Sequence, residues 1–395
     1  MPDTGLATIL VASCVALAAA ALLALLIWRL RARRIARRRA DPAKDYAVRA
    51  NWSSGYSKLN FSSFVYMDVD GDGKYSLADR PMAGIMVRLF DRHGAFIASA
   101  RTNNGGFANF AMSTSSGKAV IRSPGTYRFA VSVPPGWRAP SANEAQSMQF
   151  RHAPGSPAGL VSQDLPKPVG LSPGRSLAGS MAAGSTATLS VTANGQVLES
   201  RALAQTFRFD LADEADMVVI TGGGLDRRLA LSPYPTDLGL LSPQTLSSEV
   251  PLRTIGFDDI TRRGFRKIPS GHAGLEWRNL NAMAQDHTKG SEGYVNGNVS
   301  GDHVAYTSSG YPAEFSREIP FGFHSVLLSA AWLKSEGEMA LIESWLGERQ
   351  IASDHVALSA LTPLHYAPML KEVTRVRLST KHYWQMVLDD LVLTR

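Results

Sequence analysis

The chain has 395 residues, of which 45% are apolar and 19% charged, so it can bury hydrophobic cores and is not disordered as a whole. Its 41 Lys and Arg against 34 Asp and Glu give a formal charge of +7, but seven arginines within residues 29–39 account for this surplus. Positive and negative side chains balance in the rest of the chain, which excludes a basic nucleic-acid-binding domain. The one cysteine, Cys14, lies in an N-terminal apolar run, which excludes disulfides, zinc–cysteine sites and cysteine nucleophiles elsewhere.

Residues 5–28 form an uncharged, mostly apolar run of 24 residues. This length crosses about 30 Å of hydrocarbon as a single helix. We interpret the run as a transmembrane anchor in the lipid bilayer. A cleavable signal peptide fits less well, because the apolar core exceeds the usual ~7–15 residues and no basic residue precedes it.

The apolar run is followed directly by the arginines Arg29, Arg31, Arg33, Arg34, Arg37, Arg38 and Arg39. The positive-inside rule places them, and the chain after them, on the cytoplasmic side. They are also expected to attract anionic lipid headgroups, at about 1 kcal/mol per arginine near the surface. Both interpretations put the arginines at a membrane face.

The rest of the chain predicts an all-β protein, because short Val-, Phe- and Tyr-rich stretches are bounded by Gly, Asn and Ser. Alternating residues at 186–192 and 206–211 predict half-buried antiparallel strands. The expected segments are an anchor with its arginine-rich end at 1–39, a linker at 40–60, a β-sandwich at 61–140, a Pro/Gly/Ser-rich linker at 141–175, a second β unit at 176–249 and a jelly-roll module at 250–395.

The strongest motif is an acidic loop at residues 68–79. Its spacing matches the twelve-residue loop that wraps oxygen ligands around Ca²⁺, with glycine at position 6. The candidate ligands are Asp68, Asp70, Asp72, Lys74 through its carbonyl, Ser76 and Asp79. Aspartate in place of the usual glutamate at position 12 predicts weaker affinity. A metal-free acidic turn is the alternative, but four carboxylates in twelve residues would repel one another without a cation.

The loop is flanked by strand-like stretches at 61–67 and 84–90, so it is suited to stiffening rather than to switching. Residues 64–137 resemble the B-type repeat of bacterial SD-repeat surface proteins (SdrD B-like). The matching features are the DVDGDG loop, the turn at 81–84, TNNGGF at 102–107, PGTY at 124–127 and PPG at 134–136. The resemblance implies a calcium-stabilised β-sandwich that acts as a spacer or stalk, without catalysis.

Two aspartate pairs bracket the C-terminal region, at 258–259 and 389–390. The first and last strands of a sandwich are often neighbours, so Asp259 and Asp390 are expected to share a structural cation. The alternative is two acidic strand ends on the surface.

Between the pairs, the motifs GLEWRN at 274–279, YVNG at 294–297, IPFGF at 319–323 and AAW at 330–332 are similar to a β-jelly roll of bacterial exported proteins that resembles carbohydrate-binding modules. Sugar binding needs an exposed aromatic plane with amide or carboxylate groups beside it. The candidates are Trp277, Tyr294, Asn296, Asn298, Tyr311 and Trp345. The alternative is a scaffold in which Trp277 is core and Asn296–Gly297 is a hairpin turn.

The sequence contains no GxSxG, HExxH, Walker or GxGxxG motif, and we expect no enzyme activity. We expect a membrane-anchored protein of the bacterial cell envelope, structural or adhesive, which presents the jelly roll to a polysaccharide or to another envelope protein. The types of β module favour an extracytoplasmic location for these modules, whereas the arginine run favours the cytoplasmic side. The alternatives are a cytoplasmic-face scaffold and a polysaccharide-active enzyme.

Overall fold

The structure is a computed structural model that describes residues 60–77, 79–140, 142–241, 251–288 and 292–394. The chain divides into two units, residues 1–48 and 49–395, and the description below concerns the second. The predicted anchor at 5–28, the seven arginines and most of the first linker lie outside the described residues. Among the helices of these described ranges, none combines the length and the hydropathy that a membrane span requires.

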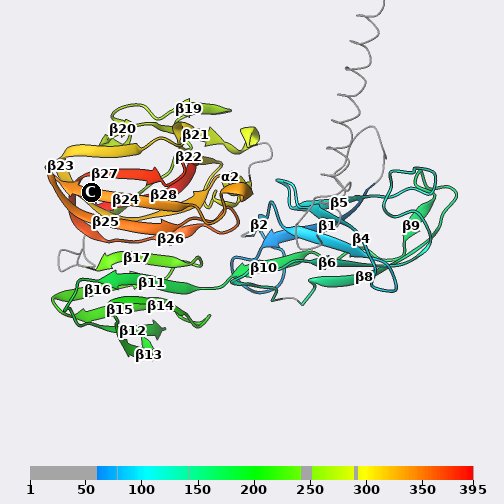
Figure 1. Ribbon diagram of the computed structural model, residues 1–395, viewed down its shortest axis with the longest axis horizontal. Helices are drawn as coiled ribbons and strands as arrows, with labels where there is room; N and C mark the ends of the chain where they lie inside the picture. The colour runs from blue at the N-terminus through cyan, green and yellow to red at the C-terminus, as the bar shows by residue number, and fades with distance from the viewer. Residues whose placement is uncertain (1–59, 78, 141, 242–250, 289–291, 395) are drawn as a thin grey trace, which may run out of the picture. The chain divides into compact units, whose positions relative to one another are not determined.

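The first β-sandwich consists of two sheets (Figure 1). One has the order β2–β1–β10–β7, with β5 also paired to β1, and the other has the order β4–β3–β6–β8–β9. The strands are β1 (Asn60–Met67), β2 (Arg80–Pro81), β3 (Met86–Phe90), β4 (Phe96–Arg101), β5 (Phe107–Ala111), β6 (Gly125–Val131), β7 (Trp137–Arg138), β8 (Ala145–His152), β9 (Leu160–Ser162) and β10 (Val169–Pro173). Alternating residues such as Phe61, Val65, Val87 and Leu89 face one buried core.

The stretch at 141–175, expected as a linker, contains β8, β9 and β10. In β8, Met148 and Phe150 are buried while Gln149 and Arg151 are exposed, a period-two pattern that the surrounding Pro, Gly and Ser obscure in the sequence. β10 pairs in parallel with β1 through Val65 and Val169. The first sandwich therefore extends to Pro173.

The second β unit contains two sheets. Three strands form one side of it in the order β14–β11–β17, and the other sheet has the order β13–β12–β15–β16. The strands are β11 (Ser176–Met181), β12 (Thr188–Ala193), β13 (Gln196–Ala202), β14 (Thr206–Asp210), β15 (Met217–Gly222), β16 (Leu225–Ala230) and β17 (Thr236–Leu241). The antiparallel pairing of β12 with β13 and β15 agrees with the sequence prediction. β17 also pairs in parallel with β26 of the next module, through Thr236 and His365.

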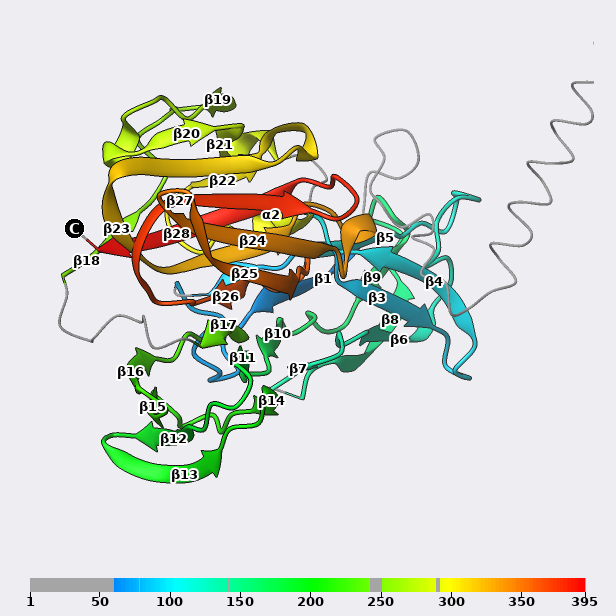
Figure 2. The same ribbon diagram turned by 60° about the vertical axis from the view of Figure 1, so that its left-hand side comes forward.

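The C-terminal module is a β-sandwich built around the long strand β23, which pairs with β20, β26, β27 and β28 (Figure 2). Its elements are β18 (Leu252–Ile255), β19 (Phe265–Lys267), β20 (Glu276–Arg278), β21 (Leu280–Ala284), α2 (Glu292–Asn296), β22 (His303–Thr307), β23 (Ala313–Ala330), β24 (Met339–Leu346), β25 (Arg349–Ala357), β26 (Leu364–Tyr366), β27 (Leu370–Thr380) and β28 (Met386–Thr394). β18 pairs with β28 from Leu252 and Thr394 to Ile255 and Leu391. The expectation that the first and last strands are neighbours is confirmed.

Candidate functional site

The acidic loop connects β1 to β2. Met67 of β1 pairs with Arg80 of β2, so the hairpin brings the first and twelfth loop positions together. Oxygen atoms of Asp68, Asp70 and Asp79 all lie within 4.8 Å of one another. Asp68 and Asp79 are buried, with 0% and 5% exposure. Two buried carboxylates and one exposed carboxylate thus converge on one point, an arrangement that hard cations such as Ca²⁺ prefer.

Backbone N–H groups of the loop hold these carboxylates in place. Asp68 Oδ1 accepts a hydrogen bond from the Gly71 N–H at 2.9 Å, and Oδ2 accepts one from the Gly73 N–H at 3.0 Å. Asp79 Oδ1 accepts from the Val69 N–H at 3.0 Å, and Oδ2 from the Ser76 N–H at 2.6 Å. Each oxygen retains acceptor capacity for a cation, since a carboxylate oxygen has two lone pairs.

The electrostatics of the loop favour added positive charge. Burial raises the pKa of Asp68, the neighbouring Asp70 and Asp79 add to the rise, and the N–H groups of Gly73 and Gly71 oppose it. Burial and the four loop carboxylates raise the pKa of Tyr66 to about 12. The Tyr66 hydroxyl is buried without a hydrogen-bond partner among the described residues. A divalent cation would offset the clustered negative charge.

The remaining predicted loop ligands are less closely grouped. Asp72 lies outside the group of three carboxylates and accepts a hydrogen bond from the Lys74 N–H at 2.7 Å. Asp72 and Lys74 are exposed, while Ser76 is half-buried and donates its N–H to Asp79. The three aspartates at positions 1, 3 and 12 therefore form the centre of the candidate site.

The two C-terminal aspartate pairs converge on one loop, at residues 298–303. From the first pair, Asp258 Oδ1 accepts the Asp302 N–H at 2.7 Å and lies 3.0 Å from His303 Nδ1. From the second, Asp389 Oδ2 accepts the N–H groups of Val299 at 2.7 Å and Ser300 at 3.0 Å. The pairs thus stabilise this loop through hydrogen bonds.

The predicted cation ligands of these pairs have separate partners. Asp259 Oδ2 lies 3.8 Å from His272 Nδ1, and Asp390 Oδ1 accepts a hydrogen bond from Ser300 Oγ at 2.6 Å. Among the described residues, neither belongs to a group of three or more side chains that could hold a metal. A cation shared by Asp259 and Asp390 stays a prediction.

Four of the six predicted sugar-binding residues are buried: Trp277 at 4% exposure, Tyr294 at 2%, Asn296 at 4% and Asn298 at 3%. Trp277 packs between Phe257 and Phe315 and donates its indole N–H to the His272 carbonyl. These four side chains offer no face to a sugar, because the packing of the sandwich encloses them. The alternative given for Trp277, a core residue, agrees with its position.

The two other predicted residues are accessible. Trp345 is half-buried beneath the guanidinium of Arg375, whose central carbon lies 4.4 Å from the ring centroid. Tyr311 is 62% exposed, and its ring centroid lies 6.0 Å from that of Tyr383, which is 65% exposed. Nothing in the sequence indicates Tyr383, because its proximity to Tyr311 arises only when the β27–β28 turn folds against the start of β23.

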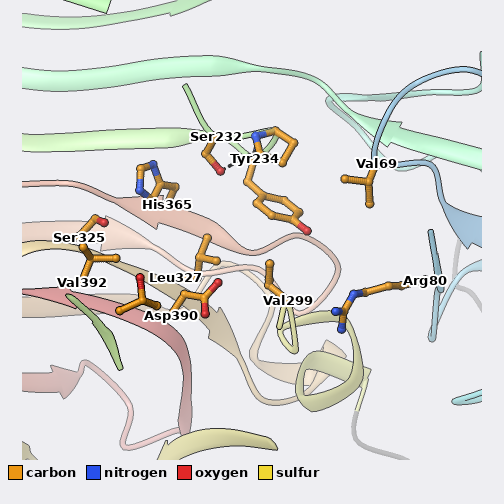
Figure 3. Close-up of a pocket in the computed structure, with 12 residues that line it drawn as sticks. Val69, Arg80, Ser232, Tyr234, Val299, Ser325, Leu327, His365, Asp390 and Val392 are labelled. Carbon is orange, nitrogen blue, oxygen red and sulfur yellow. Dashed lines mark hydrogen bonds between the residues drawn. The ribbon is translucent and has the colours of Figure 1, made fainter. Parts of the chain in front are cut away.

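A pocket of about 350 Å³ lies between the sandwich modules (Figure 3). The polar residues that line it include Arg80, Tyr234, His365 and Asp390, and Val299 is among the apolar ones. The Arg80 guanidinium donates to the Asn298 carbonyl at 2.8 Å. Burial raises the pKa of Tyr234 to about 12 and lowers that of His365 to about 4. The Tyr234 phenol and the His365 imidazole are therefore both uncharged at neutral pH.

No family model and no curated protein matches this sequence. Among solved structures, the chain is similar to the Bacillus anthracis TIE protein, at 11% identity and a TM-score of 0.21 over 46% of this chain and 33% of that one. It is also similar to the CBM22-1–GH10 modules of the Clostridium thermocellum endo-1,4-beta-D-xylanase 10B complexed with xylohexaose, at 14% identity and a TM-score of 0.17 over 24% and 22%. A third structure is the M60 catalytic domain with two CBM51 domains from Clostridium perfringens ZmpB, at 9% identity and a TM-score of 0.21 over 79% and 28%.

The chain spans a third or less of the length of these three proteins. Similarities this low do not confirm the resemblance to SD-repeat B modules or to a carbohydrate-binding module.

Proposed function

We propose that this chain is a non-enzymatic structural or adhesive protein of the cell envelope whose first β-sandwich is stabilised by Ca²⁺. The observation that carries the proposal is the convergence of Asp68, Asp70 and Asp79 within 4.8 Å, with two of the three buried. Buried charges are retained in proteins when they are paired or coordinate a metal. The backbone hydrogen bonds of the loop hold the carboxylates but add no charge to balance them.

We further propose that the β-sandwiches lie on the extracytoplasmic side of the membrane. A ligand that binds only the folded state stabilises it by RT ln(1+[L]/Kd), about 2.7 kcal/mol at a hundredfold excess. A loop with weak affinity for Ca²⁺ would bind the ion in a calcium-rich exterior, and it would be mostly empty in a cytosol with little free calcium. Extracytoplasmic sandwiches anchored by residues 5–28 fit this better than a cytoplasmic-face scaffold, which the arginine run alone favours.

Thermal unfolding of the full chain in detergent tests the stabilisation. We expect the melting temperature to rise with added CaCl₂, to fall with a chelator, and to lose both responses in the Asp70→Ala/Asp79→Ala variant. Asp164→Ala, at an exposed aspartate outside the loop, is the matched control and should respond like the unmodified chain. A melting curve that does not change on chelation would contradict the proposal.

A further inference from the structure

Two exposed tyrosines form a paired surface on the C-terminal module. Tyr311 lies just before β23, and Tyr383 lies in the turn between β27 and β28. Their ring centroids are 6.0 Å apart, with planes inclined by 58°. Single exposed apolar side chains are ordinary, but here two segments distant in sequence bring large rings together at the surface, each more than 60% exposed.

The backbone around the pair is held in a costly conformation. Tyr383, Ser309 and Asn279 have φ values of +58°, +54° and +56°, in the left-handed region that non-glycine residues rarely adopt. This conformation is unfavourable for Tyr383 and Ser309, whereas asparagine adopts it more readily, and such residues cluster at functional sites. One of these conformations belongs to an exposed tyrosine itself, and the other two lie in the segments that support Tyr311.

Specific contacts join the segment at residues 308–312 to Asn279 and to the turn that carries Tyr383. The Asn279 carboxamide donates to the carbonyls of Ser308 at 3.0 Å, Tyr311 at 2.9 Å and Pro312 at 3.2 Å. A Cβ atom on Gly310 would lie only 1.6 Å from the Tyr383 carbonyl oxygen, so the two turns are in direct backbone contact. The rings are therefore presented from a rigid base, which reduces the entropy lost when a ligand binds.

From this geometry we propose that Tyr311 and Tyr383 form a binding surface for the pyranose rings of a polysaccharide. The face of an aromatic ring carries partial negative charge, and it attracts the polarised C–H groups on the face of a sugar. Because the two rings already contact each other, a sugar would lie across them rather than between them. Arg278 precedes Asn279 and Glu314 follows shortly after Pro312, and their charged groups lie 3.8 Å apart; we expect them to supply a donor and an acceptor for hydroxyl groups of the sugar.

The arrangement points to one class of sugar. Stacking needs a sugar face that presents C–H groups. In β-1,4-linked glycans of the glucose configuration the ring hydroxyl groups are equatorial, so both faces of every ring present C–H groups. A stable protein partner would need roughly 800 Å² from this side, far more than two tyrosine side chains supply. The inference deepens the adhesive part of the proposed function, and it is independent of the calcium loop.

The test is binding of the full chain, in detergent, to cellulose, chitin and xylan, measured by depletion from solution. We expect binding to at least one of the three, and a roughly tenfold weaker affinity in Tyr311→Ala and in Tyr383→Asn, as the loss of about 1.4 kcal/mol of stacking predicts. Asparagine at 383 removes the ring but tolerates the left-handed backbone. Tyr311→Phe should retain binding, because it keeps the ring.

Phe265→Ala is the matched control, because Phe265 is 59% exposed on β19 of the same module; its binding should not change. Hydroxyl-radical footprinting should show Tyr311 and Tyr383 protected by the bound polysaccharide. Absence of binding to all three polysaccharides, or full binding by the double variant with both rings removed, would overturn the inference. Either result leaves the calcium-dependent melting temperature, and hence the proposed stabilisation, to be judged separately.

Discussion

The carboxamide of Asn296 acts as a strand partner for the backbone of Ala83. Asn296 Oδ1 accepts the Ala83 N–H at 2.9 Å, and Nδ2 donates to the Ala83 carbonyl at 3.0 Å. Nδ2 also donates to the Ala360 carbonyl at 2.9 Å. Asn296 is 4% exposed, so one buried side chain links the C-terminal module to the segment that follows the acidic loop at residues 68–79. Its role is structural, although the sequence suggested a sugar contact or a hairpin turn.

Replacement of Asn296 by alanine should destabilise the protein. The change leaves the Ala83 N–H, the Ala83 carbonyl and the Ala360 carbonyl buried without this partner, at a cost of roughly 1–3 kcal/mol for each group that water does not reach. Denaturant unfolding of the variant measures the loss. Gln196→Ala, at an exposed position on β13, should change the free energy of unfolding by less than about 0.5 kcal/mol. Equal stability of the two variants would contradict the assigned role.

Arg227 is the least expected core residue. It is 1% exposed, and its three guanidinium nitrogens have no hydrogen-bond partner among the described residues. Burial lowers its pKa to about 9, against the opposing charge of Asp354. Asp354 is itself held by the Tyr366 hydroxyl at 2.6 Å and the Leu240 N–H at 2.9 Å. The guanidinium therefore bears a desolvation cost that no direct hydrogen bond offsets.

We expect Arg227→Met to raise the free energy of unfolding by about 1–3 kcal/mol, the desolvation cost of a buried polar group without a hydrogen-bond partner. Denaturant midpoints provide the measurement. The adjacent Arg228 is exposed on the same strand, and Arg228→Met should have little effect. A lower midpoint for Arg227→Met would mean that its attraction to Asp354 outweighs its desolvation.

A fall in pH should lower the free energy of unfolding through protonation of His365. Burial, and then the charge of His324, lowers the pKa of His365 from 6.5 to about 4, and its Nδ1 lies 3.3 Å from Thr236 Oγ1. Because the folded pKa is below the unfolded one, the unfolded chain binds a proton first as the pH falls. The stability that uncharged His365 contributes is therefore fully present above about pH 6.5, and it is lost progressively as the pH falls to about 4.

Denaturant unfolding at pH 4.5 and pH 7.5 tests this prediction. His365→Gln should show a smaller loss of stability between the two pH values than the unmodified chain. His152→Gln, at an exposed position at the end of β8, should show the same loss as the unmodified chain. An identical pH dependence in all three proteins would contradict the assignment.

Local patterns predicted much of the architecture. The carboxylate spacing of residues 68–79 marked a loop in which three aspartates do converge, because the turn chemistry of such a loop is contained within twelve residues. The all-β composition and the pairing of the first and last strands of the C-terminal module were also predicted correctly. These features depend on neighbours in sequence or on a general rule of sandwich topology.

Features that depend on tertiary packing were not predictable. The aromatic rings of Trp277 and Tyr294 look the same in the sequence as that of Tyr311, yet only Tyr311 reaches the surface, because burial is decided by which strands cover which face. The strands of β8–β10 were hidden by the surrounding turn residues. Nothing in the sequence marks Tyr383, because its ring meets that of Tyr311 only in the folded chain.

The central claim is calcium binding by the loop, and calorimetric titration of the full chain with CaCl₂ tests it most directly. We predict saturable binding that the Asp68→Asn/Asp79→Asn variant loses, because it replaces the two buried carboxylates with neutral groups of the same shape. Asp259→Asn/Asp390→Asn, titrated in parallel, should retain the site in the loop. Binding of equal strength to the unmodified chain and to the Asp68→Asn/Asp79→Asn variant, or no binding at all, would contradict the claim.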